Sequence, residues 1–122
     1  GITFLILYSR SQLPGVFALS AGWGDITIGI TAPFLAWAMA RGIAKRQLII
    51  LWNALGLFDL VVAITLGVLS SAGPLGILTH GVTTQLMGRF PLSLIPTFLV
   101  PLFIIFHLIT LAMTKRARGN NA

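Results

Sequence analysis

The sequence has almost no acidic residues and no cysteine. Only two of its 122 residues are acidic, Asp25 and Asp59, and charged residues of both signs make up 8% of the chain. Without cysteine, the chain cannot form disulfides, thiolate metal sites or a cysteine nucleophile. A chain with so few charges also cannot cover itself with the polar surface of an ordinary soluble domain.

Hydrophobic residues make up 57% of the sequence. They form four apolar segments, at residues 1–9, 14–40, 48–70 and 91–114. The last three reach the roughly 20 residues that a helix needs to cross a bilayer, whereas the first covers only part of one. We therefore expect an all-α, polytopic membrane helix bundle that forms a single domain over residues 1–122. It would have three full transmembrane helices and a partial N-terminal one, with further sequence upstream.

The net charge of +6 comes from basic residues that flank the apolar segments. Six of the eight lie in two clusters, and these are Arg41, Lys45 and Arg46, and Lys115, Arg116 and Arg118. By the positive-inside rule, the short loop at residues 41–47 and the C-terminus are cytoplasmic. Basic residues are not interleaved with aromatic ones, so no nucleic-acid partner is predicted. The expected partners are the lipid bilayer and other membrane subunits.

Asp25 and Asp59 each lie deep within an apolar segment, where a carboxylate is costly and normally faces protein or water. At 1.5 Å per residue, they lie about 13 Å and about 16 Å from the same boundary. We expect the two helices to pack through faces of small residues, with both acids near the seam. Two interpretations stay open. The acids form a proton or cation site, or they lock helices together through hydroxyl groups such as those of Thr31 and Thr65.

His107 lies inside the last apolar segment, at a depth similar to that of Asn53, which can hydrogen-bond it. A buried histidine can also be an axial ligand of haem iron or of the magnesium of a chlorophyll-type pigment. His80, in the glycine-rich segment at residues 71–90, is the second candidate for such a ligand. No ligand spacing typical of a metal site is present, and no nucleophile, base and oxyanion donors converge. We expect neither a metal site nor an enzyme.

Three segments resemble an uncharacterised family of small bacterial multi-pass inner-membrane proteins. They are LPGVFALSAGWGD at 13–25, GLFDL at 56–60 and PLSLIPTFLVP at 91–101. The resemblance implies a location in a bacterial inner membrane, either the plasma membrane or an intracytoplasmic one. It implies no activity.

These observations lead to two functional hypotheses. The first is an integral membrane accessory or stabilising subunit of a larger membrane protein complex, in contact with a pigment or haem. The alternative is a small proton- or cation-coupled transporter that uses Asp25 and Asp59 as an intramembrane pair.

Overall fold

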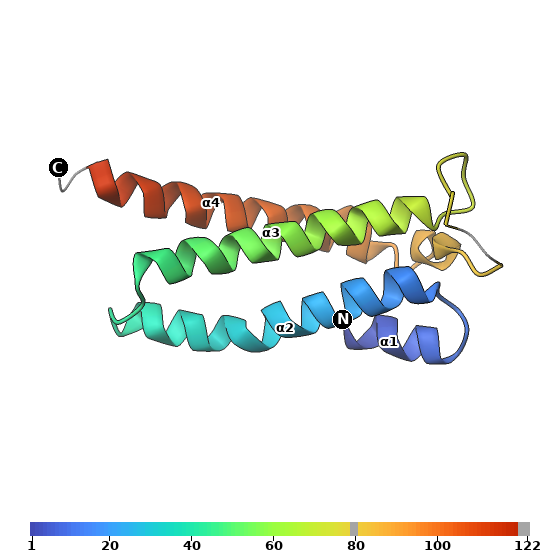
Figure 1. Ribbon diagram of the computed structural model, residues 1–122, viewed down its shortest axis with the longest axis horizontal. Helices are drawn as coiled ribbons and strands as arrows, with labels where there is room; N and C mark the ends of the chain where they lie inside the picture. Colours follow the sequence, from blue (N-terminus) through green and yellow to red (C-terminus); the bar gives the residue numbers. More distant parts are fainter. Residues whose placement is uncertain (79–80, 120–122) are drawn as a thin grey trace.

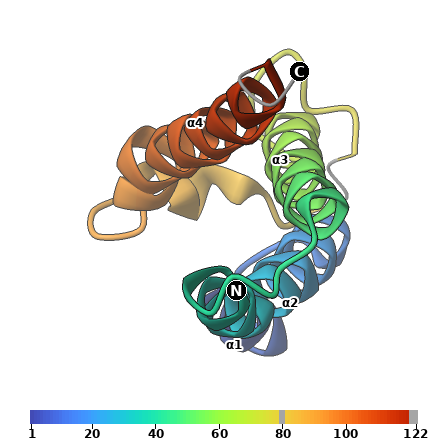
Figure 2. The ribbon, with the colours of Figure 1, turned by 90° about the vertical axis from the view of Figure 1, so that its left-hand side faces the viewer.

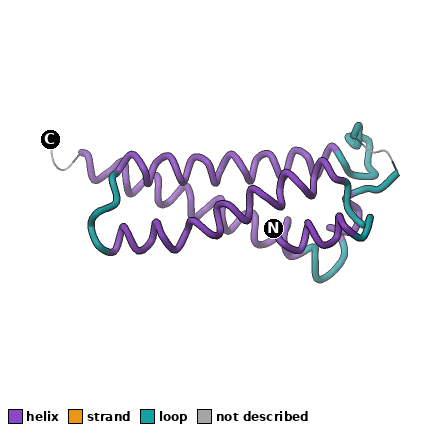
Figure 3. Tube along the Cα trace, turned by 60° about the horizontal axis from the view of Figure 1, so that its bottom comes forward, coloured by secondary structure: helices purple, strands orange, loops and turns teal. Residues whose placement is uncertain are grey.

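The computed structural model of the chain describes residues 1–78 and 81–119, and within these it is helical without strands (Figures 1 and 3). The α-helices are α1 (Ile2–Ser9), α2 (Gly15–Ala40), α3 (Arg46–Leu69) and α4 (Val100–Gly119). Two short helical segments precede α4, a 3₁₀ helix η1 (Thr84–Gly88) and a π-helical turn η2 (Ile95–Leu99). The predicted all-helical class is confirmed.

The helix boundaries follow the prolines of the sequence. Pro14 has an extended backbone conformation and caps α2, which begins one residue later. The predicted helix at 91–114 is wrong at its start, because a regular α-helix begins only at Val100 and then continues to Gly119. Pro96 and Pro101 have no N–H group to give to the carbonyl one turn earlier, and the wider π-helical turn occupies this stretch.

The helix α3 lies at the centre of the arrangement. Both α2 and α4 pack along α3, and α1 packs along α2. Viewed along the bundle, α2 and α4 lie on different sides of α3 (Figure 2). Two cavities, of about 470 Å³ and about 670 Å³, are lined by residues of all three helices.

A small apolar core closes one end of the bundle. Its centre is the contact between Phe4 of α1 and Phe17 of α2, whose ring centroids are 5.3 Å apart. Met87 of η1 joins this cluster. The hydroxyl of Thr84 donates a hydrogen bond of 2.7 Å to the carbonyl of Gly67, which ties η1 to the end of α3.

Most of the apolar surface points outward. Among the described residues, eight apolar ones are buried, whereas thirty large hydrophobic side chains are exposed. Two helical segments, Arg46–Leu69 and Ile95–Arg116, are long and apolar enough to cross a membrane, and only 17% and 0% of their apolar windows are buried. A core helix of a soluble protein is mostly buried, whereas these two segments are mostly exposed.

The helix α2 is long enough to cross a membrane, since its 26 residues rise about 39 Å at 1.5 Å per residue. It is nevertheless not among the two segments that meet the length and hydropathy criteria. Asp25, Pro33 and several glycines and threonines lower its hydropathy. Two of the three expected spans therefore have the necessary composition.

The two basic clusters lie at one end of the bundle. The loop between α2 and α3 and the C-terminal end of α4 are at the same side of Figure 1. The guanidinium Nε of Arg46 donates a hydrogen bond of 3.1 Å to the carbonyl of Thr114, which joins the start of α3 to α4. The positive charges are thus separated from the apolar middle of the bundle.

Candidate functional site

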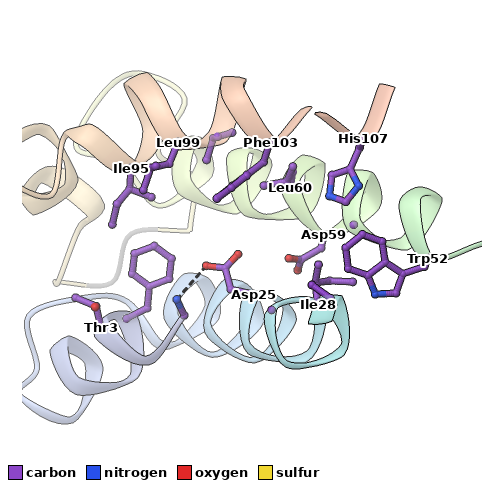
Figure 4. Close-up of a pocket in the computed structure, with 16 residues that line it drawn as sticks. Thr3, Asp25, Ile28, Trp52, Asp59, Leu60, Ile95, Leu99, Phe103 and His107 are labelled. Atoms are coloured by element: carbon purple, nitrogen blue, oxygen red, sulfur yellow. Dashed lines mark ion pairs between the residues drawn. The ribbon is translucent and has the colours of Figure 1, made fainter. Parts of the chain in front are cut away.

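The central cavity has a volume of about 470 Å³ and lies between the helices. Residues from α1, α2, α3, η2 and α4 line it. Its ionisable side chains are Asp25, Asp59 and His107 (Figure 4). The sequence placed the two acids at similar depth, and the structure brings both to this one cavity. The remaining side chains of the lining are mainly apolar and aromatic.

Asp59 of α3 lies against the backbone of α2 at Gly24. A Cβ atom built on Gly24 would overlap the carboxyl group of Asp59, so only glycine allows this close approach. The carboxylate therefore sits beside the residue that precedes Asp25. In the described part of the chain, Asp59 forms no hydrogen bond and no ion pair, and its side chain is half-buried.

Asp25 of α2 faces the same space, with its side chain 33% exposed. Its Oδ2 atom lies 3.2 Å from the α-amino group of Gly1, and the two form an ion pair (Figure 4). Asp25 also lines a second, larger cavity of about 670 Å³, whose lining is mainly apolar and comes from all four α-helices and from η1 and η2. It therefore stands where the two cavities adjoin.

His107 of α4 is only 9% exposed and forms one hydrogen bond within the described residues. Its Nδ1 atom lies 2.9 Å from Oδ1 of Asn53. The amide group of Asn53 is oriented by its own Nδ2, which donates to the carbonyl of Ile49 at 2.8 Å. Because Oδ1 can only accept, the neutral imidazole carries its proton on Nδ1 and leaves Nε2 as a free acceptor. The expected contact between His107 and Asn53 is therefore confirmed.

The imidazole of His107 rests on a second glycine. A Cβ atom on Gly56 of α3 would overlap the ring at Cε1 and Nε2. The indole of Trp52 covers the ring as well, with centroids 5.3 Å apart. The closeness of α3 leaves little room for a flat macrocycle beside Nε2, so this geometry favours hydrogen bonding over axial ligation of haem or a pigment.

Comparison with known families gives the chain a relationship but no activity. A family described as a domain of unknown function, DUF8737, matches residues 1–114. The chain belongs to the DUF8737 family. No curated protein and no solved structure matches it. The family agrees with the uncharacterised group expected from the sequence segments, and the function has to be argued from the site.

The threonines predicted to bind the acids have other partners. The hydroxyl of Thr65 donates to the carbonyl of Val61 at 2.7 Å, and that of Thr31 donates to Thr27 at 2.7 Å. In a helix, the carbonyl one turn earlier is the nearest acceptor for a threonine hydroxyl. Thr31 also accepts a hydrogen bond of 2.8 Å from the indole of Trp52, which links α2 to α3.

The predicted packing of α2 on α3 is confirmed, but the predicted face of small residues does not form the contact. Gly22 faces α1, where the side chain of Leu5 lies 2.8 Å from the position of a Cβ atom. Gly29 has nothing within 4 Å of that position and lines the central cavity. The α2 residue that faces Asp59 is Gly24, which lies on a different side of the helix.

Two further results complete the comparison with the sequence. His80 lies outside the described residues. Within the described ranges, no three His, Asp or Glu side chains come close enough to hold a metal ion together. The sequence did not reveal the roles of Gly24 and Gly56. A glycine that a side chain of the next helix contacts cannot be distinguished from other glycines until the packing of the helices is known.

Proposed function

We propose that the chain is a multi-pass integral membrane protein of the bacterial inner membrane, with α2, α3 and α4 crossing it and the basic end in the cytoplasm. The support is physical. The exposed apolar surface of α3 and α4 is suited to lipid, and the basic residues lie together at one end. A helix bundle also satisfies its backbone hydrogen bonds internally, as the bilayer core requires.

For the activity, we propose a small proton- or cation-coupled transporter that uses Asp25 and Asp59. The observation that carries this proposal is that both acids of the sequence line one cavity. In an apolar setting a carboxylate is stable only with a proton, a cation or a hydrogen-bond donor. Asp59 has no such partner within the described residues, so it is available to bind and release one.

A flux assay in proteoliposomes tests this function. With a pH difference across the membrane, the parent protein should dissipate the gradient, and Asp25→Asn and Asp59→Asn should reduce the rate to that of empty vesicles. Circular dichroism and size-exclusion profiles must stay unchanged, since asparagine keeps the shape of the side chain. Rates equal to the parent in both folded variants would contradict the proposal.

The second candidate is an accessory or stabilising subunit of a larger membrane complex. The observation in its favour is the exposed apolar surface of α3 and α4, which a helix of another subunit can cover. Gentle purification of the native protein followed by sizing tests it. A stable larger species with a defined second subunit supports this function, whereas a lone monomer contradicts it.

A further inference from the structure

The ionisable side chains that line the central cavity are the carboxylates of Asp25 and Asp59 and the imidazole of His107, and Thr3 adds a hydroxyl group. The carboxylates are acceptors, and one ring nitrogen of His107 is already bonded to Asn53. The one indole N–H in the lining, that of Trp52, is already bonded to Thr31. No lysine or arginine side chain lines the cavity. A ligand that fits this set must bring donors and positive charge.

An ammonium group has both properties. It carries one positive charge and three N–H donors, so it can donate hydrogen bonds to two carboxylates at the same time. Asp59 forms no hydrogen bond and no ion pair within the described ranges, which leaves its carboxylate free to accept from such a group.

The rest of the cavity is suited to an apolar body. Phe4, Trp52 and Phe103 line it from three different helices, together with aliphatic side chains such as Leu60 and Leu99. Aromatic faces attract cations and also pack against apolar groups. The volume of about 470 Å³ lies within the range of roughly 300–1,000 Å³ that small-molecule sites occupy.

We propose that the central cavity binds an organic primary ammonium ion whose apolar, aryl-bearing body packs against the aromatic lining. The ammonium group is held by the carboxylates of Asp25 and Asp59, and the body extends toward Phe103 and Leu99 of α4 and η2. This inference rests on the proposed cation-coupled function, because it names the class of cation.

Calorimetry on the purified protein in detergent tests the ligand class. The probe is phenethylammonium, and the matched control is 2-phenylethanol, which has the same aryl body but no charge. We expect phenethylammonium to bind at least about tenfold more tightly than the alcohol, as loss of a charge-assisted hydrogen bond predicts. Equal affinities, or no binding of phenethylammonium, would overturn the proposal.

Variants locate the binding. Asp59→Asn should weaken phenethylammonium binding at least about tenfold by the same reasoning. Gln12→Lys changes the net charge by the same amount at an exposed position that does not line the cavity, and should leave binding unchanged. If Gln12→Lys weakens binding as much as Asp59→Asn does, the effect is one of overall charge and the proposal fails.

A second pair of variants keeps both acids. Gly29 lines the cavity, and a Cβ atom there would meet no atom within 4 Å, so Gly29→Leu adds bulk at the lining without a clash at its Cβ. Thr27→Leu, on the same helix but outside the lining, is the control. Binding should be lost in Gly29→Leu only. Unchanged binding in Gly29→Leu would show that the ligand is elsewhere.

The outcome is separable from that of the proposed function, because binding is measured without transport. If phenethylammonium does not bind while proton flux still depends on Asp25 and Asp59, the transport function stands and the ligand class is wrong. If the ion binds but no flux is found, the cavity is a binding site and the transport function is wrong.

Discussion

Two glycines of the bundle each receive a polar side chain from the next helix, and their surroundings differ. At Gly56, the ring of His107 is buried, hydrogen-bonded to Asn53 and covered by Trp52. At Gly24, the carboxyl group of Asp59 is half-buried and has no hydrogen bond within the described residues. Both are close helix contacts, but within the described residues only His107 has a hydrogen-bond partner in the protein.

The difference separates a structural role from a binding role. A buried polar group that has all its hydrogen bonds holds its helices together. Removing one of these bonds lowers the free energy of unfolding, because a buried polar atom is left unpaired. A carboxylate left without a partner stabilises little, yet it is free to take a proton or a cation. We therefore expect variants at the His107 site to reduce stability and variants at the Asp59 site to reduce function.

The largest effect on stability is expected at Gly56. Alanine there places a methyl group into the ring of His107, which Trp52 and Asn53 prevent from moving away. Overpacking of this kind costs about 1–3 kcal/mol in the free energy of unfolding. The gain in helix propensity, about 1 kcal/mol, offsets part of this cost and is the same in the Gly29→Ala control. Thermal unfolding in detergent measures it, with Gly29→Ala as the control, since that position is open. Equal midpoints for the two variants would show that α3 and α4 do not meet at Gly56.

The next effect concerns the hydrogen bond between Asn53 and His107. A double-mutant cycle with Asn53→Leu and His107→Leu should give a coupling energy of about 1 kcal/mol, because either single change leaves a buried polar group unpaired. The double variant should be more stable than the sum of the two single effects predicts. Strictly additive losses would mean that the two side chains do not bond.

The sequence predicted the helices, apart from the start of the last one, and predicted that the two acids come to the same level of the bundle, because the length of an apolar run and the rise per residue fix both. It did not predict how each helix is rotated. The helix α2 is apolar on nearly every side, so nothing in its pattern distinguishes the face of Gly22, which meets α1, from that of Gly24, which meets Asp59. The π-helical turn η2 was not predicted for another reason, since prolines in an apolar run indicate a break in the helix but not the type of turn that replaces it.

A smaller effect distinguishes the two threonines that were expected near the acids. Thr31→Val removes the acceptor of the indole N–H of Trp52 and should cost about 0.5–1.5 kcal/mol. Thr65→Val removes only a bond to the carbonyl of its own helix and should change the unfolding free energy by less than about 0.5 kcal/mol. Tryptophan fluorescence should shift in Thr31→Val alone. A larger loss of unfolding free energy in Thr65→Val than in Thr31→Val would contradict the hydrogen bond between Trp52 and Thr31.

The smallest effect on stability is expected at Gly24. In Gly24→Ala the new methyl group displaces the end of the Asp59 side chain, which can turn into the cavity. The gain in helix propensity, about 1 kcal/mol, offsets much of the cost of that movement. The unfolding midpoint should therefore stay close to that of the parent, while gradient dissipation in proteoliposomes changes. A large loss of stability would mean that Asp59 is locked in place.

The account is tested most directly by measuring unfolding midpoint and proton flux together in two variants, Asp59→Asn and Asn53→Leu. It predicts that Asp59→Asn unfolds like the parent and has lost its flux, whereas Asn53→Leu unfolds earlier and keeps its flux per folded molecule. Full flux in Asp59→Asn, or loss of flux confined to folded Asn53→Leu, would contradict it.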